Sequence, residues 1–259
     1  MTETTAGVEG PEWSAKAELW AELWAHLADP ARALILDETA VGPGTRLLDV
    51  GCGSGELCAQ AAARGATVSG LDAAEGMIAI ARRRLPGADL RVGPMEALPW
   101  ADGSFDVVTG VNAFQFAADV AGALAEARRV ARPGGLVVVC NWSGQREVCT
   151  VLDALSDLLP PQPPEPGRPR LRQAGVLERL AREAGLEPGP AGEVDVPYEV
   201  PDQATLERAL LIDAEMLGVI DAVGEDEARR VVLDATARNR RPDGSYRFAN
   251  RFRYLIARA

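Results

Sequence analysis

The chain has 259 residues, of which 47% are apolar and 25% are charged. These proportions are typical of a folded globular protein and exclude the composition of a disordered chain. The formal net charge of −11 would repel the phosphates of DNA or RNA, so we expect no nucleic-acid partner. For this length, one domain with added helices is the expected organisation.

Targeting signals and metal ligands are sparse. The segment Met1–Thr5 has no basic residues followed by an apolar run, and no stretch reaches the roughly 20 apolar residues that span a bilayer. We therefore expect a cytoplasmic location and no membrane partner. With one histidine and no CxxC pair, we expect no metal site and free thiols at Cys52, Cys58, Cys140 and Cys149.

The first predicted element is an amphipathic helix from Trp13 to Leu27. Its large apolar residues fall at positions i, i+3, i+4 and i+7, which places them on one helical face: Trp20, Leu23, Trp24 and Leu27. Pro30 and the stretch 41–44 are interpreted as breaks after this helix.

Strands and helices then alternate. We expect strands at 45–50, 66–71, 90–92, 105–111 and 136–142. Helices are expected from Gly55, around Met77 and from Val120 to Ala131, the last one stopped by Pro133-Gly134-Gly135. Strands separated by helices pair in parallel through right-handed crossovers. The pattern therefore predicts an α/β fold with a doubly wound sheet and a ligand crevice at the carboxyl ends of its strands.

The second half of the chain predicts a helical cap and two more strands. Residues 160–169 contain six prolines and are expected to form a loop. A helix at 176–184, a strand at 194–200, two helical stretches within 202–238 and a last strand at 246–256 should follow, which makes seven strands in all. One face of the last strand carries Arg247, Arg251 and Arg253, for which a solvated face is favoured over an anion-binding site.

A glycine-rich loop follows the first strand. The strand ending at Val50 leads into Gly51-Cys52-Gly53-Ser54-Gly55 and then a helix, so that a nearly bare backbone meets a helix N-terminus. Such a loop admits a ligand at close range. A dinucleotide fingerprint needs Gly or Ala at the sixth position, where this chain has Glu56. An NAD-dependent oxidoreductase is therefore the less favoured alternative.

Two acids extend this pattern. Asp72 ends the second strand about 20 residues after the glycines, where a carboxylate can accept both hydroxyls of a ribose. Asp49 precedes the first glycine by two residues and adds negative charge that favours an ammonium or sulfonium group. Together they predict S-adenosylmethionine as the cofactor.

Four segments carry a family resemblance. They are LLDVGCGSGELC from Leu47, the acid in Gly70-Leu71-Asp72, MEALPWADGSFDVV from Met95 and VARPGGLVVV from Val130. In this order and spacing the chain resembles the class I S-adenosylmethionine-dependent methyltransferases, especially the ubiquinone and menaquinone methyltransferase group. The resemblance runs from about residue 41 to 142. It implies a Rossmann-like, mostly parallel seven-stranded sheet whose last strand is antiparallel and inserted beside the sixth.

The resemblance also implies roles for residues. Gly51, Cys52 and Gly53 would line the methionine part of the cofactor, and Asp72 would hold the ribose. Gly93-Pro94 stands where the family often has an acid that binds the adenine amino group, so adenine recognition is expected from Met95 and Glu96. The full set of expected cofactor contacts is Asp49, Gly51, Cys52, Gly53, Asp72, Ala73, Met77, Met95, Glu96 and Asn112.

Residues for the acceptor and for proton transfer are less marked. His26 is the one candidate base, with a plain surface histidine as the alternative. Candidate substrate contacts are Trp20, Trp24, Gln115 and Trp142; for the first two, a place in the core is the favoured alternative.

The predicted function is methyl transfer to oxygen, nitrogen or carbon of a small-molecule acceptor, with natural-product tailoring included. A cyclase, an isomerase or a noncatalytic partner of the same fold is the alternative. We expect a single domain composed of a lid (1–40), a cofactor-binding core (41–142), a C-terminal half with a cap insertion (143–245) and the final strand (246–259). A homodimer stays open.

Overall fold

The structure is a computed structural model that describes residues 10–160, 170–216 and 218–259, without the side chains of 213–216. The expected absence of a leader at Met1–Thr5 lies outside these residues, and so does the proline-rich loop apart from Pro160. Among the helices of these ranges, none is both long and apolar enough to cross a bilayer.

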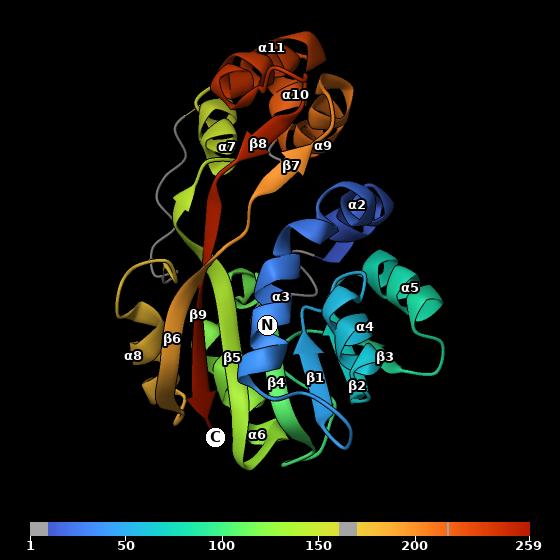
Figure 1. Cartoon of the computed structure of the whole chain (residues 1–259), viewed down its shortest axis with the longest axis vertical. Helices are drawn as coiled ribbons and strands as arrows, with labels where there is room; N and C mark the ends of the chain where they lie inside the picture. The colour runs from blue at the N-terminus through green and yellow to red at the C-terminus, as the bar shows by residue number, and fades with distance from the viewer. Residues whose placement is uncertain (1–9, 161–169, 217) are drawn as a thin grey trace.

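One seven-stranded sheet forms the centre of the lower part of the molecule, in the order β3-β2-β1-β4-β5-β9-β6 (Figure 1). Neighbouring strands from β3 to β5 pair in parallel, whereas β9 is antiparallel to both β5 and β6. The predicted α/β class, the doubly wound order and the inserted antiparallel strand are confirmed. The strands are β1 (Arg46–Val50), β2 (Thr67–Asp72), β3 (Asp89–Val92), β4 (Phe105–Val111), β5 (Ala131–Arg146), β6 (Glu187–Asp195) and β9 (Asn250–Arg258).

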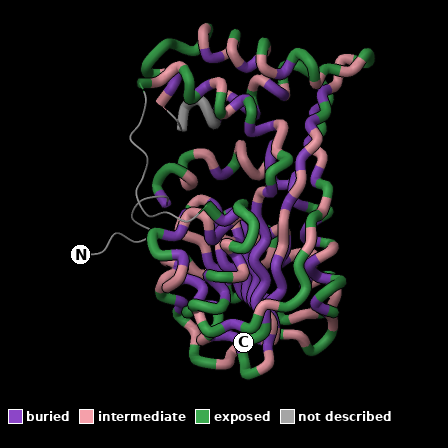
Figure 2. Tube along the Cα trace, turned by 90° about the vertical axis from the view of Figure 1, so that its left-hand side faces the viewer, coloured by how far each residue is buried: buried purple, intermediate pink, exposed green. Residues whose placement is uncertain are grey.

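Helices cover both faces of this sheet. The helices α3 (Asp29–Glu38), α4 (Glu56–Ala63) and α5 (Glu75–Arg84) pack on the face that carries Leu47, Val107 and Val138. The helices α6 (Val120–Val130) and α8 (Val176–Glu183) pack on the opposite face, which carries Leu48 and Val108. Successive side chains of a strand point to opposite faces, so strands covered on both faces are mainly apolar. Figure 2 shows the resulting band of buried residues in the sheet.

The strand β5 is longer than expected. It begins at Ala131, which was expected at the end of the preceding helix, and runs past Trp142 to Arg146. Ala131 pairs with Phe105 of β4, and the register shifts before the regular ladder resumes at Leu136. A residue before proline is driven toward extended conformations. Pro133 therefore ends helix α6 early and allows the strand to start before the glycines.

The N-terminal segment also departs from the prediction of one helix over 13–27. Helix α2 (Gly10–Leu23) ends before Trp24, and a short 3₁₀ helix η1 (Ala25–Ala28) carries Leu27. Helix α3 was not predicted, because Pro30 was interpreted as a break. Proline fits the first turn of a helix, where its missing N–H leaves no bond unmade, and Pro30 occupies that position in α3.

A helical cap lies above the sheet in Figure 1. It contains α7 (Cys149–Ser156), α9 (Gln203–Met216), α10 (Val219–Val223) and α11 (Glu225–Thr236), so three α-helices stand where two helical stretches were expected after Asp202. Gly224 separates the last two helices, with φ of +86°.

Two predicted strands are each divided between the sheet and the cap. The expected strand 194–200 separates into β6 and β7 (Tyr198–Val200), and the last strand separates at Ala249 into β8 (Tyr246–Phe248) and β9. β7 and β8 form their own two-stranded sheet. At the break, the Ala249 N–H donates to the Glu147 carboxylate at 2.7 Å, which replaces a strand partner.

Candidate functional site

The glycine loop lies between the carboxyl end of β1 and the start of α4. The N–H groups of Gly51 and Cys52 both donate to the carbonyl of Leu71, at 2.7 and 3.0 Å, which ties the loop to β2. Gly51 and Gly53 have φ of +69° and +53°, a region that residues with a Cβ rarely adopt. A Cβ on Gly51 would overlap the side chain of Ala113. The bare backbone is therefore required where the loop meets the end of β4.

Asp72 is bound to this loop. Its Oδ2 accepts from the Gly53 N–H at 2.8 Å, and its Oδ1 accepts from the Ala74 N–H at 2.9 Å. Burial raises the pKa of Asp72, and the backbone N–H groups around it oppose that rise. Each carboxylate oxygen has two acceptor sites. The side chain thus holds the loop and keeps an acceptor site on each oxygen for a ligand.

Asp49 is buried beneath the loop, with 3% of its surface exposed. Thr109 Oγ1 donates to Asp49 Oδ1 at 2.8 Å. Burial raises the pKa of Asp49 to about 7, while the hydrogen bond from Thr109 and the positive charge of Arg32 act in the opposite direction. A cation that approaches this carboxyl would favour its ionised form.

Asn112 follows β4 and shows two unusual features. Its φ is +52°, outside the region of most residues with a side chain, and its N–H donates to the carbonyl of Cys140 at 2.7 Å. Its Oδ1 is buried without a hydrogen-bond partner among the residues described. Backbone strain and an unpaired buried acceptor concentrate at functional sites. A Cβ on Gly51 would overlap the Cβ of Ala113, the residue after Asn112, so Asn112 lies beside the glycine loop.

The residues expected near adenine occupy the ends of β2 and β3. The Gly93 N–H donates to the carbonyl of Asp72 at 3.0 Å, which brings the loop with Met95 and Glu96 beside the acid. Met95 is buried, and Glu96 Oε1 accepts from the Ala118 N–H at 2.8 Å.

Helix α2 covers this edge. A Cβ on Gly10 would lie 2.6 Å from the carbonyl oxygen of Ala73, and Met77 is buried in a small cluster with Ala17 of α2. Trp20 lies over the glycine loop, with a ring atom 3.8 Å from the position of a Cβ on Gly53.

Two aromatic residues that the sequence did not single out complete this cover. The ring of Trp13 packs edge-on against Trp20 and against Phe116, with centroids 6.0 and 5.8 Å apart. Phe116 belongs to η2 (Phe114–Phe116), directly after Asn112 and Ala113. Rings from the N-terminal helix and from the segment after β4 thus meet above the loop. Both segments are visibly aromatic in the sequence, but the sequence did not show that the two segments contact each other.

The remaining predicted site residues lie in different parts of the structure. Trp24 is buried, stacks on Tyr198 with centroids 4.5 Å apart and donates from Nε1 to the carbonyl of Ala209 at 3.1 Å, so its contacts are with the cap. His26 is exposed, and its ring centroid lies 5.6 Å from that of Tyr198. Trp142 is half-buried and edge-on to Phe252. The half-buried Gln115 lies on η2 beside the crevice.

Other charged groups and thiols have structural roles. Arg247 pairs with Glu199, and Arg251 pairs with Asp195 and Glu193, on a solvated face as expected. Arg253 pairs with Glu178 in a largely buried position, which differs from that expectation. All four cysteines are buried and free, and burial raises the pKa of the Cys52 thiol well above its usual value. Glu56 pairs with Arg84 at the start of α4.

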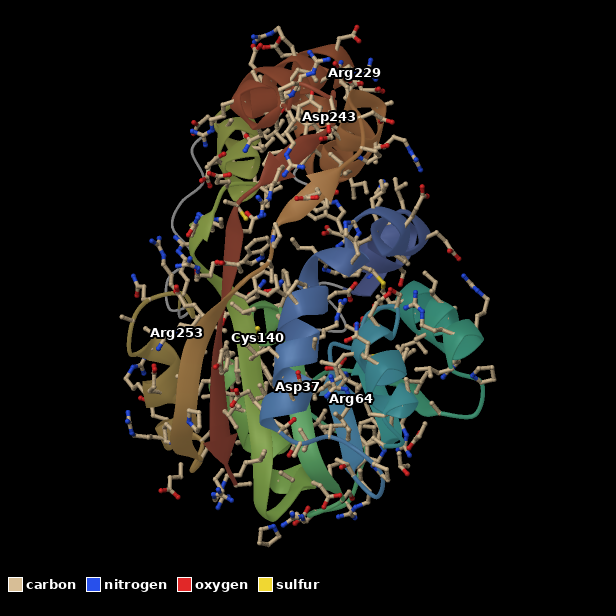
Figure 3. All side chains as sticks on the ribbon, in the orientation of Figure 1. Asp37, Arg64, Cys140, Arg229, Asp243 and Arg253 are labelled. Carbon is tan, nitrogen blue, oxygen red and sulfur yellow. The ribbon has the colours of Figure 1, made fainter. Side chains whose placement is uncertain are left out.

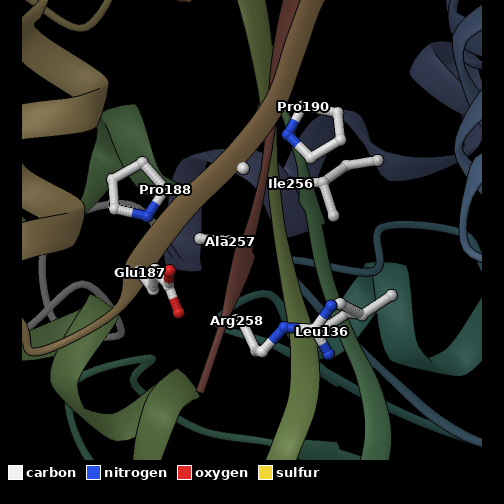
Figure 4. A pocket seen from close by; sticks show the side chains of 8 residues that line it. Leu136, Glu187, Pro188, Pro190, Ile256, Ala257 and Arg258 are labelled. Carbon is white, nitrogen blue, oxygen red and sulfur yellow. The ribbon is translucent and has the colours of Figure 1, made fainter.

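A hollow of about 190 Å³ lies away from this crevice, between β5, β6 and β9 (Figure 4). Its lining includes Leu136, Pro188 and Ile256. Leu136 is the residue of β5 at which the pairing with β9 begins. No residue of the glycine loop lines it. We therefore place the candidate site at the loop and at the ends of β1, β2 and β4.

Comparison with known proteins agrees with this position. Residues 48–139, which include the glycine loop, Asp72 and Asn112, match the family model described as a methyltransferase domain. This segment is thus similar to the class I S-adenosylmethionine-dependent methyltransferases that the sequence resembles. S-adenosylmethionine, the cofactor expected from the sequence, is the cofactor that this family implies.

Two curated relatives match this methyltransferase domain. A demethylmenaquinone methyltransferase of Renibacterium salmoninarum is 40% identical over 112 residues, which cover 43% of this chain and 47% of the relative. A ubiquinone biosynthesis O-methyltransferase of Hahella chejuensis is 41% identical over 116 residues, covering 42% and 48%. The matched part thus spans about half the length of these relatives.

Solved structures share the fold over more of the chain. The 4+2 cyclase SpnF has a TM-score of 0.64 at 21% identity, covering 99% of this chain and 97% of its own. A putative methyltransferase of Bacillus halodurans has a TM-score of 0.61 at 18% identity, covering 88% and 97%. At these identities the likeness concerns the fold of the methyltransferase domain and its surroundings.

Proposed function

We propose that this chain transfers the methyl group of S-adenosylmethionine to a small-molecule acceptor. The proposal rests on three features that lie together at one edge of the sheet. These are the glycine loop held by Asp72, the buried carboxyl of Asp49, and the unpaired Oδ1 of Asn112. The matched family and the names of the relatives support the same activity.

The residues fit the parts of this cofactor. The two glycines leave a backbone that a ligand can approach closely, and the acceptor sites left on Asp72 suit the two hydroxyls of a ribose. The Oδ1 of Asn112 suits the ammonium of the methionine part, since a buried acceptor without a donor costs free energy until a donor arrives. When bound, S-adenosylmethionine supplies a methyl group on a positively charged sulfur.

The protein contributes mainly position and shelter. Trp13, Trp20 and Phe116 place apolar rings over the loop, which excludes water from the crevice. Holding two reactants in line converts a bimolecular step into one within the complex, and this effect alone lowers the barrier greatly. His26 is the candidate base, and its stacking beside Tyr198 ties its position to that of the cap.

The acceptor is chosen in this proposal by the lid (1–40) and by the cap insertion within 143–245. The contacts of Trp24 with Tyr198 and with the carbonyl of Ala209, which join the lid to the cap, support this assignment. Relatives named for demethylmenaquinone and for ubiquinone biosynthesis favour a small organic acceptor, with methylation on oxygen, nitrogen or carbon and natural-product tailoring as one setting.

The proposal is tested with cofactor that carries a deuterated methyl group. The purified chain is incubated with this cofactor and a set of quinols, phenols, amines and enolisable ketones, and products are read by mass spectrometry. We expect the label in one acceptor class and an equal amount of S-adenosylhomocysteine. A heat-denatured sample of the same protein is the control.

A reaction without methyl transfer is the second candidate. Its support is the cyclase SpnF, which covers 99% of this chain with the same fold. In the labelled experiment, an acceptor that is converted while the cofactor stays intact would decide for this second candidate and against methyl transfer.

A further inference from the structure

Three strands of the large sheet, β5, β6 and β9, join the cap through connections that lie side by side (Figure 1). β5 leads to α7 through residues 147–148, β6 leads to β7 through residues 196–197, and β8 leads to β9 through Ala249. We call these three connections the neck. A backbone N–H that leaves a sheet needs a new acceptor, because an unpaired buried donor costs free energy. The bonds within the neck therefore set the place of the cap relative to the sheet.

Glu147 binds the neck from the end of β5. Its Oε2 accepts from the Ala249 N–H at 2.7 Å, and its own N–H donates to the Ala249 carbonyl at 3.3 Å. The same Oε2 accepts from Asn239 Nδ2 at 3.2 Å, and this amide also donates to the carbonyl of Arg247 on β8. The Glu147 carbonyl accepts from the N–H and the hydroxyl of Thr150 in the first turn of α7. One residue thus holds the end of β8 and the start of α7.

Asn250 adds the third connection to the neck. Its side chain is buried, and its Oδ1 accepts from the Val148 N–H at 3.1 Å. Its carbonyl accepts from the Val196 N–H at 2.9 Å, between β6 and β7. Asn250 is also the partner of Arg146, where the register between β5 and β9 shifts. All three connections are therefore cross-linked by hydrogen bonds, and the carboxylate of Glu147 is the charged group among them.

The neck is linked to the lid through the small sheet of the cap. β8, whose end Glu147 holds, pairs with β7, which carries Tyr198. The Tyr198 hydroxyl donates to the carbonyl of Leu23 at 3.1 Å, and its ring stacks on Trp24 directly after α2. Helix α2 places Trp20 over the glycine loop. A continuous series of contacts thus runs from Glu147 to the cover of the crevice.

We propose that Glu147 is a positioning residue for methyl transfer: its carboxylate fixes the neck, and the neck holds Tyr198 against the end of the lid. The inference rests on the proposed function, because the lid covers the crevice assigned to the cofactor. A reaction that depends on position loses rate when a distant change displaces the site by about 1 Å. Loss of the Glu147 carboxylate should therefore loosen the lid, although this side chain lies outside the crevice.

Hydrogen exchange of the full chain, together with calorimetric titration of S-adenosylhomocysteine, tests this role. In Glu147→Ala we expect exchange at the end of α2 to be about 3- to 10-fold faster than in the unchanged protein, the size that loss of one hydrogen bond gives. The affinity for S-adenosylhomocysteine should fall by about the same factor. Glu147→Gln keeps an acceptor oxygen at the same reach and should restore most of both quantities.

Asp243→Ala is the matched control. Asp243, labelled in the cap in Figure 3, also accepts from a backbone N–H, that of Ser245 at 3.0 Å, but in the turn before the other end of β8. Its loss should speed exchange in this turn and leave α2 and the ligand affinity as in the unchanged protein. If Glu147→Ala does not fold, Glu147→Asp, whose carboxylate is one methylene shorter, takes its place and should show the same effects in α2.

The outcomes separate this inference from the proposed function. If the unchanged protein does not bind S-adenosylhomocysteine, the proposed function fails, and the role of Glu147 in methyl transfer fails with it. If the unchanged protein binds this ligand, but the Glu147 variant that folds alters exchange only in the neck and the cap, the proposed function stands. Glu147 then has a local structural role, which overturns the inference.

Discussion

At the scale of single residues, the site combines groups that are individually unfavourable. The carboxyl of Asp49 is buried. Asn112 has a positive φ, and its buried Oδ1 has no hydrogen-bond partner among the described residues. Strain of this kind costs about 1–3 kcal/mol per residue and persists where the surroundings impose it. The hydrogen bonds to Thr109 and Cys140 impose it here, which prepares polar groups before a ligand arrives.

The raised pKa of Asp49 predicts a pH dependence of stability. Between the usual value of 3.8 and the folded value of about 7, the native chain holds a proton that the unfolded chain has released. The free energy of unfolding must therefore fall as the pH rises through this window, and between pH 5 and pH 8 this group contributes a fall of roughly 3 kcal/mol. Asp49→Asn should lack this part of the decline. Urea unfolding of both proteins at pH 5 and pH 8 measures the difference, and parallel pH profiles would contradict the assignment.

Asp72 predicts an effect on ligand binding. Asp72→Ala removes the acceptors that remain for the ribose and also frees the Gly53 N–H. We expect S-adenosylhomocysteine to bind more weakly by about 1–3 kcal/mol, the usual cost of losing charge-assisted hydrogen bonds. Calorimetric titration measures this change. Asp89→Ala, at the exposed start of β3, is the control, and equal affinity in both variants would remove Asp72 from the site.

At the scale of elements, the close packing of α2 on α5 positions the lid. Gly76 lies at the start of α5, where a Cβ would be 2.6 Å from the carbonyl oxygen of Ser14 on α2. The Gly76 N–H donates to Ser14 Oγ at 3.2 Å, and Arg83 pairs with Glu18 further along the same two helices. The absence of a side chain at Gly76 thus sets how closely the lid approaches the core.

Gly76→Ala should push α2 away from α5. We expect a loss of about 1–3 kcal/mol in the free energy of unfolding, as for overpacked contacts, and faster hydrogen exchange in α2. Gly144→Ala is the control, because a Cβ there meets nothing within 4 Å. Equal stability and unchanged exchange in the two variants would show that α2 is not held by this contact.

The sequence predicted the elements of the core better than those around it. In the core, short apolar runs bounded by glycine turns clearly indicate strands. The predicted bounds of β1, β2 and β4 agree with the structure to within about one residue. Helix α3 was not predicted because a proline is found both where a helix breaks and in the first turn of a new helix. Pro30 was interpreted as a break but lies in the first turn of α3. The last strand was expected to be continuous, since alternation persists across Ala249 although the pairing changes there.

The sequence predicted those site residues that belong to one continuous motif. The loop and Asp72 follow each other through one strand–helix–strand unit, and the structure joins them. Trp13 and Phe116 come together only through tertiary packing.

At the scale of the whole molecule, the cap is joined to the lid. Trp24 stacks on Tyr198 with the ring planes 2° apart, and the Tyr198 hydroxyl donates to the carbonyl of Leu23 at 3.1 Å. The donation from Trp24 Nε1 to Ala209 adds helix α9 to the same junction. The cap and the segment that covers the glycine loop are therefore joined by direct contacts.

This junction predicts coupled energies. Trp24→Leu and Tyr198→Leu should each destabilise the fold, and the double variant should lose less than the sum by about 0.5–1.5 kcal/mol, as for aromatic pairs in contact. Chemical unfolding of the four proteins measures the coupling. A cycle of Trp24 with Trp100, which packs on Phe105 at the start of β4, is the control and should be additive. Additivity in both cycles would contradict a lid–cap junction.

The central claim is that the crevice binds S-adenosylmethionine, and parallel calorimetric titration of the full chain tests it most directly. The chain is titrated with S-adenosylmethionine, with S-adenosylhomocysteine and with NAD. We predict saturable binding of both sulfur nucleosides at one site per chain and no binding of NAD. Binding of NAD with no heat from either sulfur nucleoside would contradict the account.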